Sequence, residues 1–139
     1  MEPFGLGCQI CVFAHIIDVL NDFNIQVTNK TQVQKAVKNL SPKQMDILFG
    51  NMAGYFGVLA EPTRLRIMYA VCTGEKSVSE VIELCGSSQA NVSRHLAALY
   101  KAGIINRRKQ GVTVYYSIAD NETVEMCQLV CSRLAQSLH

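Results

Sequence analysis

Six cysteines are the residues of this 139-residue sequence with the widest chemistry, because thiolates bind metals and exchange disulfides. Near the N-terminus, Cys8, Cys11 and His15 recur at helical spacing, opposite an apolar stripe. Thiolate and imidazole are ligands that zinc and thiophilic metalloids prefer, so this cluster is a candidate metal half-site. The alternative is that both cysteines pack as small hydrophobic residues, because Cys-x-x-Cys with one histidine leaves a tetrahedral site incomplete.

Cys127 and Cys131 belong to a second pattern near the C-terminus. Spacings of 3 and 4, typical of a helix-pairing seam, separate Val124, Cys127, Cys131, Leu134 and Leu138. At i and i+4 on one helix, Cβ atoms lie about 5–6 Å apart. A disulfide needs about 3.5–4.5 Å. The two cysteines are therefore not expected to bridge each other, and could pair with another helix, with their symmetry mates or with a metal.

The segment from Ser87 to Gly103 predicts one helix with an apolar face and a polar, basic face. Val92, Leu96 and Leu99 form the apolar stripe, and Gly103 stands where a left-handed C-terminal cap belongs. A helix in the DNA major groove needs small and hydrogen-bonding side chains on its outer face. Residues of this kind are Ser87, Ser88, Gln89, Asn91, Ser93 and Arg94. Alone, the segment is equally consistent with an ordinary amphipathic surface helix.

The following residues favour DNA binding. Residues 104–109 and 112–118 are rich in β-branched and aromatic residues and are joined by Gln-Gly, which predicts a hairpin. Three consecutive cations stand near its tip: Arg107, Arg108 and Lys109. No acidic residue lies between Glu83 and Asp120, and this cation-only span carries a charge of +5, against +2 for the whole chain. Such a local field suits a phosphate backbone, so two helices and a basic hairpin together predict a winged helix-turn-helix.

Three motifs, in this order, resemble those of the ArsR/SmtB family of bacterial repressors. They are Glu61-Pro-Thr-Arg-Leu-Arg-Ile, Ser93-Arg-His-Leu and Gly111-Val-Thr-Val-Tyr-Tyr-Ser-Ile. The resemblance covers roughly residues 50–139. It implies a homodimer of winged helices that occupies an operator in double-stranded DNA. It also implies that the dimer leaves the operator when a small inorganic effector binds or modifies the protein.

The resemblance also narrows the range of candidate effectors. Members that sense zinc through the C-terminal helix use Asp, His, His and Glu; here those positions are Asp120, Glu122, Arg133 and Gln136, and arginine cannot ligate a metal. The Cys-x-Cys that cadmium, lead or arsenite sensors often carry before the recognition helix is replaced by Ser77-Val-Ser. Members that sense oxidants or sulfane sulfur use one cysteine after the Pro-Thr-Arg motif and one in the last helix. Cys72, Cys127 and Cys131 resemble that set by element, although the family's first cysteine aligns with Tyr69.

The remaining pattern predicts a mainly α fold with a small β-hairpin. Residues 1–45 are predicted to form a helical N-terminal extension, and residues 46–139 a winged helix-turn-helix domain for DNA binding and dimerisation, with dimerising terminal helices. Ser41-Pro42 and Pro62 mark helix starts. In the helix after Pro62, one apolar stripe is expected to contain Leu65, Met68, Tyr69 and Cys72. In the helix capped by Ser77, the inward face is expected to contain Val78, Val81, Ile82 and Cys85.

Composition argues against other classes of protein. The apolar run at 10–20 is short and contains His15 and Asp18, and no secretory cleavage site is visible, so we expect a cytoplasmic protein with no membrane partner. Cys8 and Cys11 lack the surrounding βαβ pattern of a thiol-disulfide oxidoreductase, so we expect no enzyme and no catalytic residue. A winged helix that binds protein, the remote alternative, has no use for the cation-only span.

The sequence thus predicts a sequence-specific DNA-binding repressor with a cysteine-based switch. Thiol oxidation or persulfide formation at Cys72, Cys127 and Cys131 is the favoured chemistry. The alternative is a repressor of the same family that senses a thiophilic metal or metalloid such as arsenite, zinc or cadmium. The sequence does not require a cofactor. The one candidate cofactor is a metal or metalloid bound by thiolates.

Overall fold

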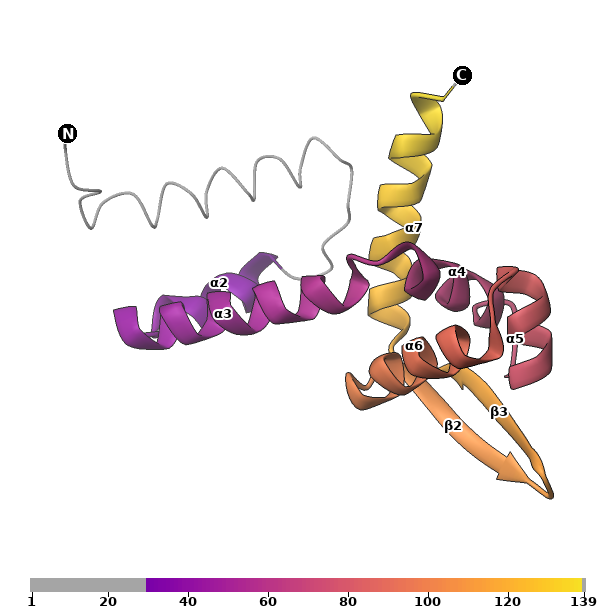
Figure 1. Cartoon of the computed structure of the whole chain (residues 1–139). Coiled ribbons are helices and arrows are strands. Elements are labelled where there is room, and N and C mark those ends of the chain that lie inside the picture. The colour runs from indigo at the N-terminus through magenta and orange to yellow at the C-terminus, as the bar shows by residue number, and fades with distance from the viewer. Residues whose placement is uncertain (1–29, 139) are drawn as a thin grey trace. The chain divides into compact units, whose positions relative to one another are not determined.

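The computed structural model describes residues 30–138, and the predicted ligands Cys8, Cys11 and His15 lie outside them (Figure 1). The chain divides into two compact units, Met1–Ile47 and Leu48–His139. Helix α2 spans Lys30–Lys38, and helix α3, Pro42–Leu59, contains the boundary between the units. The predicted domain boundary after residue 45 stays a prediction.

Helix α3 begins where the Ser41-Pro42 pair predicts. The hydroxyl of Ser41 accepts from the backbone N–H of Gln44 at 3.3 Å, and the side-chain oxygen of Gln44 accepts from the backbone N–H of Ser41 at 2.8 Å. These reciprocal bonds satisfy two backbone donors that the first helical turn leaves open.

The second unit is a winged helix-turn-helix, as predicted. After α3 its elements are α4 (Pro62–Val71), β1 (Lys76–Ser77), α5 (Val78–Cys85), α6 (Gln89–Lys101), β2 (Ile105–Gln110), β3 (Thr113–Ile118) and α7 (Asn121–Gln136). The three strands form an antiparallel sheet in the order β1-β3-β2. Strands β2 and β3 extend beyond the helices as a two-stranded hairpin, the wing (Figure 1).

Local signals explain the boundaries of the two central helices. Ser77 and Glu80 form a complete capping box at the start of α5, and Ser88 caps α6 through the N–H of Asn91. Gly86 and Gly103 follow these helices with φ of +60° and +75°, in the left-handed region that favours glycine. The predicted cap of α5 at Ser77 and the predicted left-handed glycine after α6 are confirmed.

One apolar core holds the helices to the sheet. Its fully buried members are Ile67, Val71, Val81, Val92, Leu96, Leu99, Ile104 and Ile105. The predicted inner face of α5 is confirmed, since Val81 and Cys85 are buried and two further members pack beside them. Burial of these side chains is the main force that assembles the domain.

The predicted stripe of α4 is wrong. Met68 is buried as expected, but Leu65 is 43% exposed and Tyr69 is 78% exposed. The helix instead buries Ile67, Ala70 and Val71. Apolar residues occupy both faces of α4, so helical periodicity admits two registers, and only the packing of α5 and α6 selects between them. In the described residues 30–138, no helix has the length and apolar character needed to cross a membrane.

Candidate nucleic-acid interface and thiol sites

Helix α6 has the two faces that the sequence predicts. Val92, Leu96 and Leu99 have no exposed surface, whereas Gln89, Ser93 and Arg94 are exposed. The buried stripe fixes which side of the helix faces outward, because rotating it would bring apolar side chains into water. The outward side chains are those suited to base edges in a major groove.

A short chain of hydrogen bonds organises the outer face of α6. The amide nitrogen of Asn91 donates to the hydroxyl of Ser87 at 2.9 Å, and Nη2 of Arg94 donates to the amide oxygen of Asn91 at 2.8 Å. The Asn91 amide would have to exchange both bonds to read an adenine edge, since base reading uses the same two groups. In this arrangement the amide of Asn91 holds the guanidinium of Arg94 on the outer face of α6.

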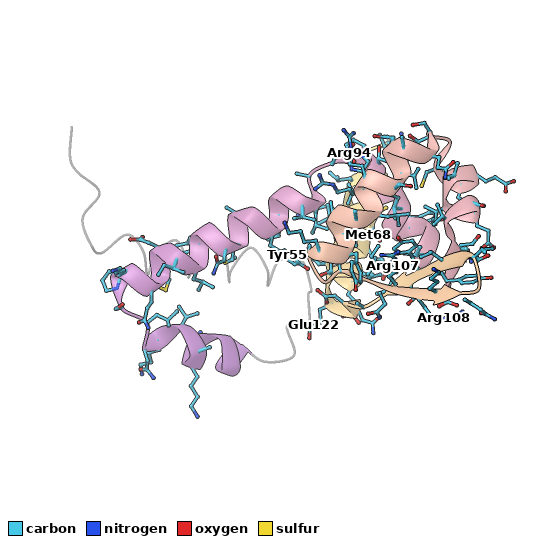
Figure 2. The ribbon with its side chains drawn as sticks, turned by 60° about the horizontal axis from the view of Figure 1, so that its bottom comes forward. Tyr55, Met68, Arg94, Arg107, Arg108 and Glu122 are labelled. Carbon is cyan, nitrogen blue, oxygen red and sulfur yellow. The ribbon has the colours of Figure 1, made fainter. Side chains whose placement is uncertain are left out.

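The three cations of the wing are divided between its two faces. Arg107 pairs across the hairpin with the buried Tyr116, and Arg108 pairs with Tyr115. Directly opposed residues share a face and successive residues alternate, so Arg107 lies on the face of the sheet that carries Tyr116 and Arg108 on the opposite face (Figure 2). Both arginine side chains are exposed. The guanidinium of Arg108 lies 4.9 Å from the centroid of the Tyr115 ring, which agrees with this placement.

Arg108 is also paired with a carboxylate from outside the cation-only span. Its Nε lies 3.1 Å from Oε2 of Glu75, and its Nη2 lies 2.5 Å from Oε1. The hydrogen bonds from Arg108 lower the pKa of Glu75 below its usual value. Residue 75 reaches the wing because β1, which follows it, pairs with β3. The wing therefore presents less net positive charge than the sequence alone indicates.

The four cysteines of the described residues are free thiols. Cys85 is buried in the core, as predicted, and burial raises its pKa. Cys127 is half-buried against the same core, and burial raises its pKa as well. Cys131, one turn later, is exposed, and Sγ of the half-buried Cys72 donates to the carbonyl of Tyr69 at 3.0 Å. The raised pKa of Cys127 disfavours its reactive thiolate. Cys131 is therefore the α7 cysteine that is more accessible to a thiol reagent.

The predicted helix-pairing seam of α7 is split by the fold. Val124 and Cys127 pack against the core of their own chain. From Cys131 onward the seam is exposed, with Leu134 at 60% and Leu138 at 84% exposure. Half of the pattern is thus explained within one chain, and the other half is an uncovered apolar stripe.

Asp120, the first residue of the family's zinc set, serves here as the N-cap of α7. Its carboxylate accepts from the backbone N–H of Thr123 at 3.1 Å and from the hydroxyl of Tyr55 at 3.0 Å. The hydroxyl of Thr123 contacts both the carboxylate of Asp120 and the hydroxyl of Tyr55. Burial, with Asp120 beside it, raises the pKa of Tyr55 to about 12, so the phenol stays a donor. Within residues 30–138, no group of three or more histidine, cysteine and acidic side chains is placed to hold a metal ion.

The cap at Asp120 predicts a pH-dependent loss of stability. Hydrogen bonds from Thr123 outweigh burial and lower the pKa of Asp120 in the folded protein. Its stabilisation is therefore present above the unfolded-state pKa of about 3.9 and is lost as pH falls through the lower folded value. We expect Asp120→Ala to reduce the free energy of unfolding by about 0.5–2 kcal/mol at pH 7. Asp120→Asn, which keeps a capping oxygen, is the matched control.

Urea denaturation at one fixed protein concentration and several pH values measures this difference. The gap between the parent and Asp120→Ala should narrow below about pH 4, where the unfolded carboxylate becomes protonated. A gap that stays constant down to the acid range would show that the charge of Asp120 adds nothing to the cap.

Sequence reasoning missed a polar cluster beneath the recognition helix. His95 on α6 is 6% exposed, and its Nδ1 lies 3.2 Å from Nε of Arg64 and 3.6 Å from a carboxylate oxygen of Glu61. Burial alone would raise the pKa of Glu61, but hydrogen bonds from the backbone N–H groups of Arg64 and Thr63 bring it below its usual value. Arg64 and His95 belong to the Glu-Pro-Thr-Arg and Ser-Arg-His-Leu motifs, but no pattern in the sequence indicates that these two motifs meet in space.

A helix-turn-helix with an exposed hydrogen-bonding face on its second helix, followed by a basic wing, defines a winged-helix DNA-binding protein. The model of the bacterial regulatory protein arsR family matches residues 61–107. The transcriptional repressor SmtB homolog of Synechocystis is 34% identical over 106 residues, 76% of each chain. The chain therefore belongs to the ArsR family of bacterial DNA-binding transcriptional repressors, which are regulators and not enzymes.

Other similar proteins have names that refer to mercury resistance, to a reduced form or to a homodimer. A probable mercury resistance operon repressor of Streptomyces lividans is 35% identical over 77 residues, 55% of this chain and 62% of that protein. Among solved structures, reduced HlyU from Vibrio cholerae has a TM-score of 0.57 and 30% identity, covering 63% of this chain and 93% of that one. A homodimeric winged helix-turn-helix DNA-binding domain from Mycobacterium bovis has a TM-score of 0.61 and 26% identity, covering 73% and 93%.

Proposed function

We propose that this repressor binds its operator as a homodimer and that a thiol switch involving α7 releases it. The observation that carries operator binding is the pairing of an outward hydrogen-bonding face on α6 with a basic wing. The proposed contact residues lie in the turn before α6, on its outer face and in the wing: Ser87, Ser88, Gln89, Asn91, Ser93, Arg94, Arg107, Arg108 and Lys109. The homodimer is supported by the uncovered seam of α7 and by the homodimeric relative from M. bovis.

The division of the wing cations predicts unequal effects on DNA binding. Arg107→Ala and Lys109→Ala should each reduce the slope of log K against log salt by about 0.9, provided that each cation neutralises one phosphate. Arg108→Ala should change the slope less, because Arg108 is paired with Glu75 in the free protein and part of its charge is already compensated. Fluorescence anisotropy with labelled duplexes at several salt concentrations measures all three slopes.

Two further variants separate charge from sequence reading. Lys43→Ala removes a cation outside the cation-only span and should leave the slope unchanged. Gln89→Ala should keep the slope but reduce the preference for the selected sequence over a random duplex by roughly 1–3 kcal/mol. Unaltered slopes in both Arg107→Ala and Lys109→Ala would refute the wing as a phosphate-binding element.

The switch is proposed to act through Cys72, Cys127 and Cys131. An oxidant or a polysulfide would join Cys72 to a cysteine of α7 and so change the position of a terminal helix. All three are thiols outside the fully buried core, and the name of one structural relative, reduced HlyU, specifies a redox state. Displacing the paired recognition helices from the spacing of successive major grooves, about 34–36 Å, would release the DNA.

Metal sensing is the second candidate. The mercury-related name of the S. lividans relative favours it, as does the candidate set Cys8, Cys11 and His15. Because residues 30–138 hold no group of three or more suitable ligands, that version needs these N-terminal residues to close a thiolate-rich site with the α7 cysteines. A chelator would then restore operator binding after metal treatment.

A further inference from the structure

Arg64 connects three helices through its side chain and its backbone. Its Nη1 donates to the carbonyl of Val58 in the last turn of α3 at 2.8 Å. Its Nε donates to Nδ1 of His95 on α6 at 3.2 Å, while its own backbone N–H is held by the carboxylate of Glu61 at 2.9 Å. The last carbonyls of a helix lack intrahelical donors, so Arg64 completes the end of α3 while it holds α6.

The bond between Arg64 and His95 uses the imidazole as the acceptor. A guanidinium carries donors only, so Nδ1 of His95 supplies the lone pair for Nε of Arg64. Glu61 lies near the same nitrogen at 3.6 Å but accepts from the backbone of Arg64 instead. The guanidinium is thus the donor that orients His95.

This bond is directional, whereas the apolar contacts of α6 are not. Val92, Leu96 and Leu99 hold α6 by apolar packing, which tolerates small rotations of the helix. His95 joins α6 to α4 through a side-chain hydrogen bond, the one that its Nδ1 accepts from Arg64. His95 directly follows Arg94 and lies one turn after Asn91, so its position sets where the outer face points.

We propose that Arg64 is a positioning residue for sequence-specific DNA binding. Arg64 is held by the carbonyl of Val58 at the end of α3, and its bond to His95 restricts the rotation of α6 about its axis. This restriction sets the direction of the base-reading side chains. This proposal rests on the proposed operator binding and deepens it. It also gives α7 a physical route to α6, because Tyr55, one turn before Val58, is bonded to the N-cap of α7.

A double-mutant cycle tests the proposal on the full chain. The probes are a duplex selected by the parent protein from a random pool and a scrambled duplex of equal length. His95→Leu, which removes the acceptor, should lower the affinity for the selected duplex about tenfold or more, which corresponds to the loss of one well-placed base contact. Affinity for the scrambled duplex and the salt slope should stay unchanged, because the phosphate-binding cations are untouched.

Two variants separate positioning from mere packing. His95→Gln keeps a side-chain acceptor and should retain most of the preference for the selected duplex. Arg64→Lys keeps the charge but cannot bridge two acceptors, and it should lower the preference as His95→Leu does. Because both act on one bond, the double variant Arg64→Lys/His95→Leu should lose little more preference than His95→Leu alone.

The outcomes are distinguishable. The proposal is overturned if all variants keep the parent's preference, or if both duplexes lose affinity equally in step with the melting temperature. Strictly additive losses in the double variant would overturn it as well. Should His95→Leu fail to fold, Arg64→Lys against His95→Gln decides the same question. If the parent itself shows no salt-dependent DNA binding, the proposed function fails instead.

Discussion

Leu134→Asp is expected to yield monomers that no longer hold an operator. Leu134 is 60% exposed in the single chain and continues the seam from Cys131 to Leu138, so the proposed dimer would cover it. An unpaired carboxylate buried in that interface costs several kcal/mol, enough to dissociate the dimer at micromolar concentration. A lone winged helix then reads one half-site and loses the geometric advantage of two paired recognition helices.

Sedimentation velocity on the parent and the variant measures the assembly directly. Ser132→Asp is the matched control, because residue 132 lies on the opposite side of α7 and adds the same charge to the same helix. That control should remain dimeric and bind the operator. A parent protein that sediments as a monomer at micromolar concentration would refute the dimer, whatever the variants do.

The parts of the fold that the sequence predicts are those with strong local signals. In α6 an N-cap, a single apolar stripe and a terminal glycine all specify the same helix, so its bounds and inner face could be predicted. The hairpin could be predicted in the same way, since its β-branched and aromatic runs flank a Gln-Gly turn. In each case every signal needed is contained within a few residues.

The features that sequence reasoning missed depend on contacts between distant residues. Strand β1 has two residues, too few to show a period, yet its pairing with β3 brings Glu75 to Arg108. Counting charges along the chain could not include a carboxylate that tertiary structure delivers to the wing. Alternation along β2 places Arg108 and Arg107 on opposite faces of the hairpin. Which of the two shares a face with the buried Tyr116 depends on the register of the strands.

His95 illustrates the same limit inside the core. In sequence it is a polar residue within a helix, and helical periodicity alone does not say whether it meets solvent or a partner. Its burial becomes favourable because α4 supplies Arg64 as donor, 31 positions earlier in the chain. Prediction of such a pair needs the packing of α4 against α6, which the wrong stripe for α4 would have misplaced.

The double variant Cys127→Ser/Cys131→Ser is expected to lose operator release by hydrogen peroxide and polysulfide. With peroxide, two thiols give up two electrons and two protons, form one disulfide, and reduce the peroxide to two waters. With polysulfide, a thiolate attacks the terminal sulfane sulfur, forms a persulfide and expels the shortened polysulfide anion as the old S–S bond breaks. A second thiolate then attacks that persulfide, forms the disulfide and expels hydrosulfide. Both routes need an α7 cysteine, so the double variant should stay on the DNA.

The single variants assign the roles within the switch. Cys131 is exposed, whereas burial raises the pKa of Cys127, so Cys131→Ser should slow release more than Cys127→Ser. Cys72→Ser should block the cross-link while leaving the α7 thiols open to modification. Cys85→Ala alters a thiol that is buried in the core, and it is the matched control that should respond like the parent.

Release is measured by anisotropy on the selected duplex after peroxide, polysulfide, zinc and arsenite in turn, with mass spectrometry of the same samples. The thiol version predicts that the parent loses two hydrogens with peroxide or polysulfide and that the double variant does not. Release of the parent by zinc or arsenite alone, reversed by a chelator, would support the metal version instead. A double variant released like the parent by all four would refute both versions, because the α7 cysteines would then serve only in packing.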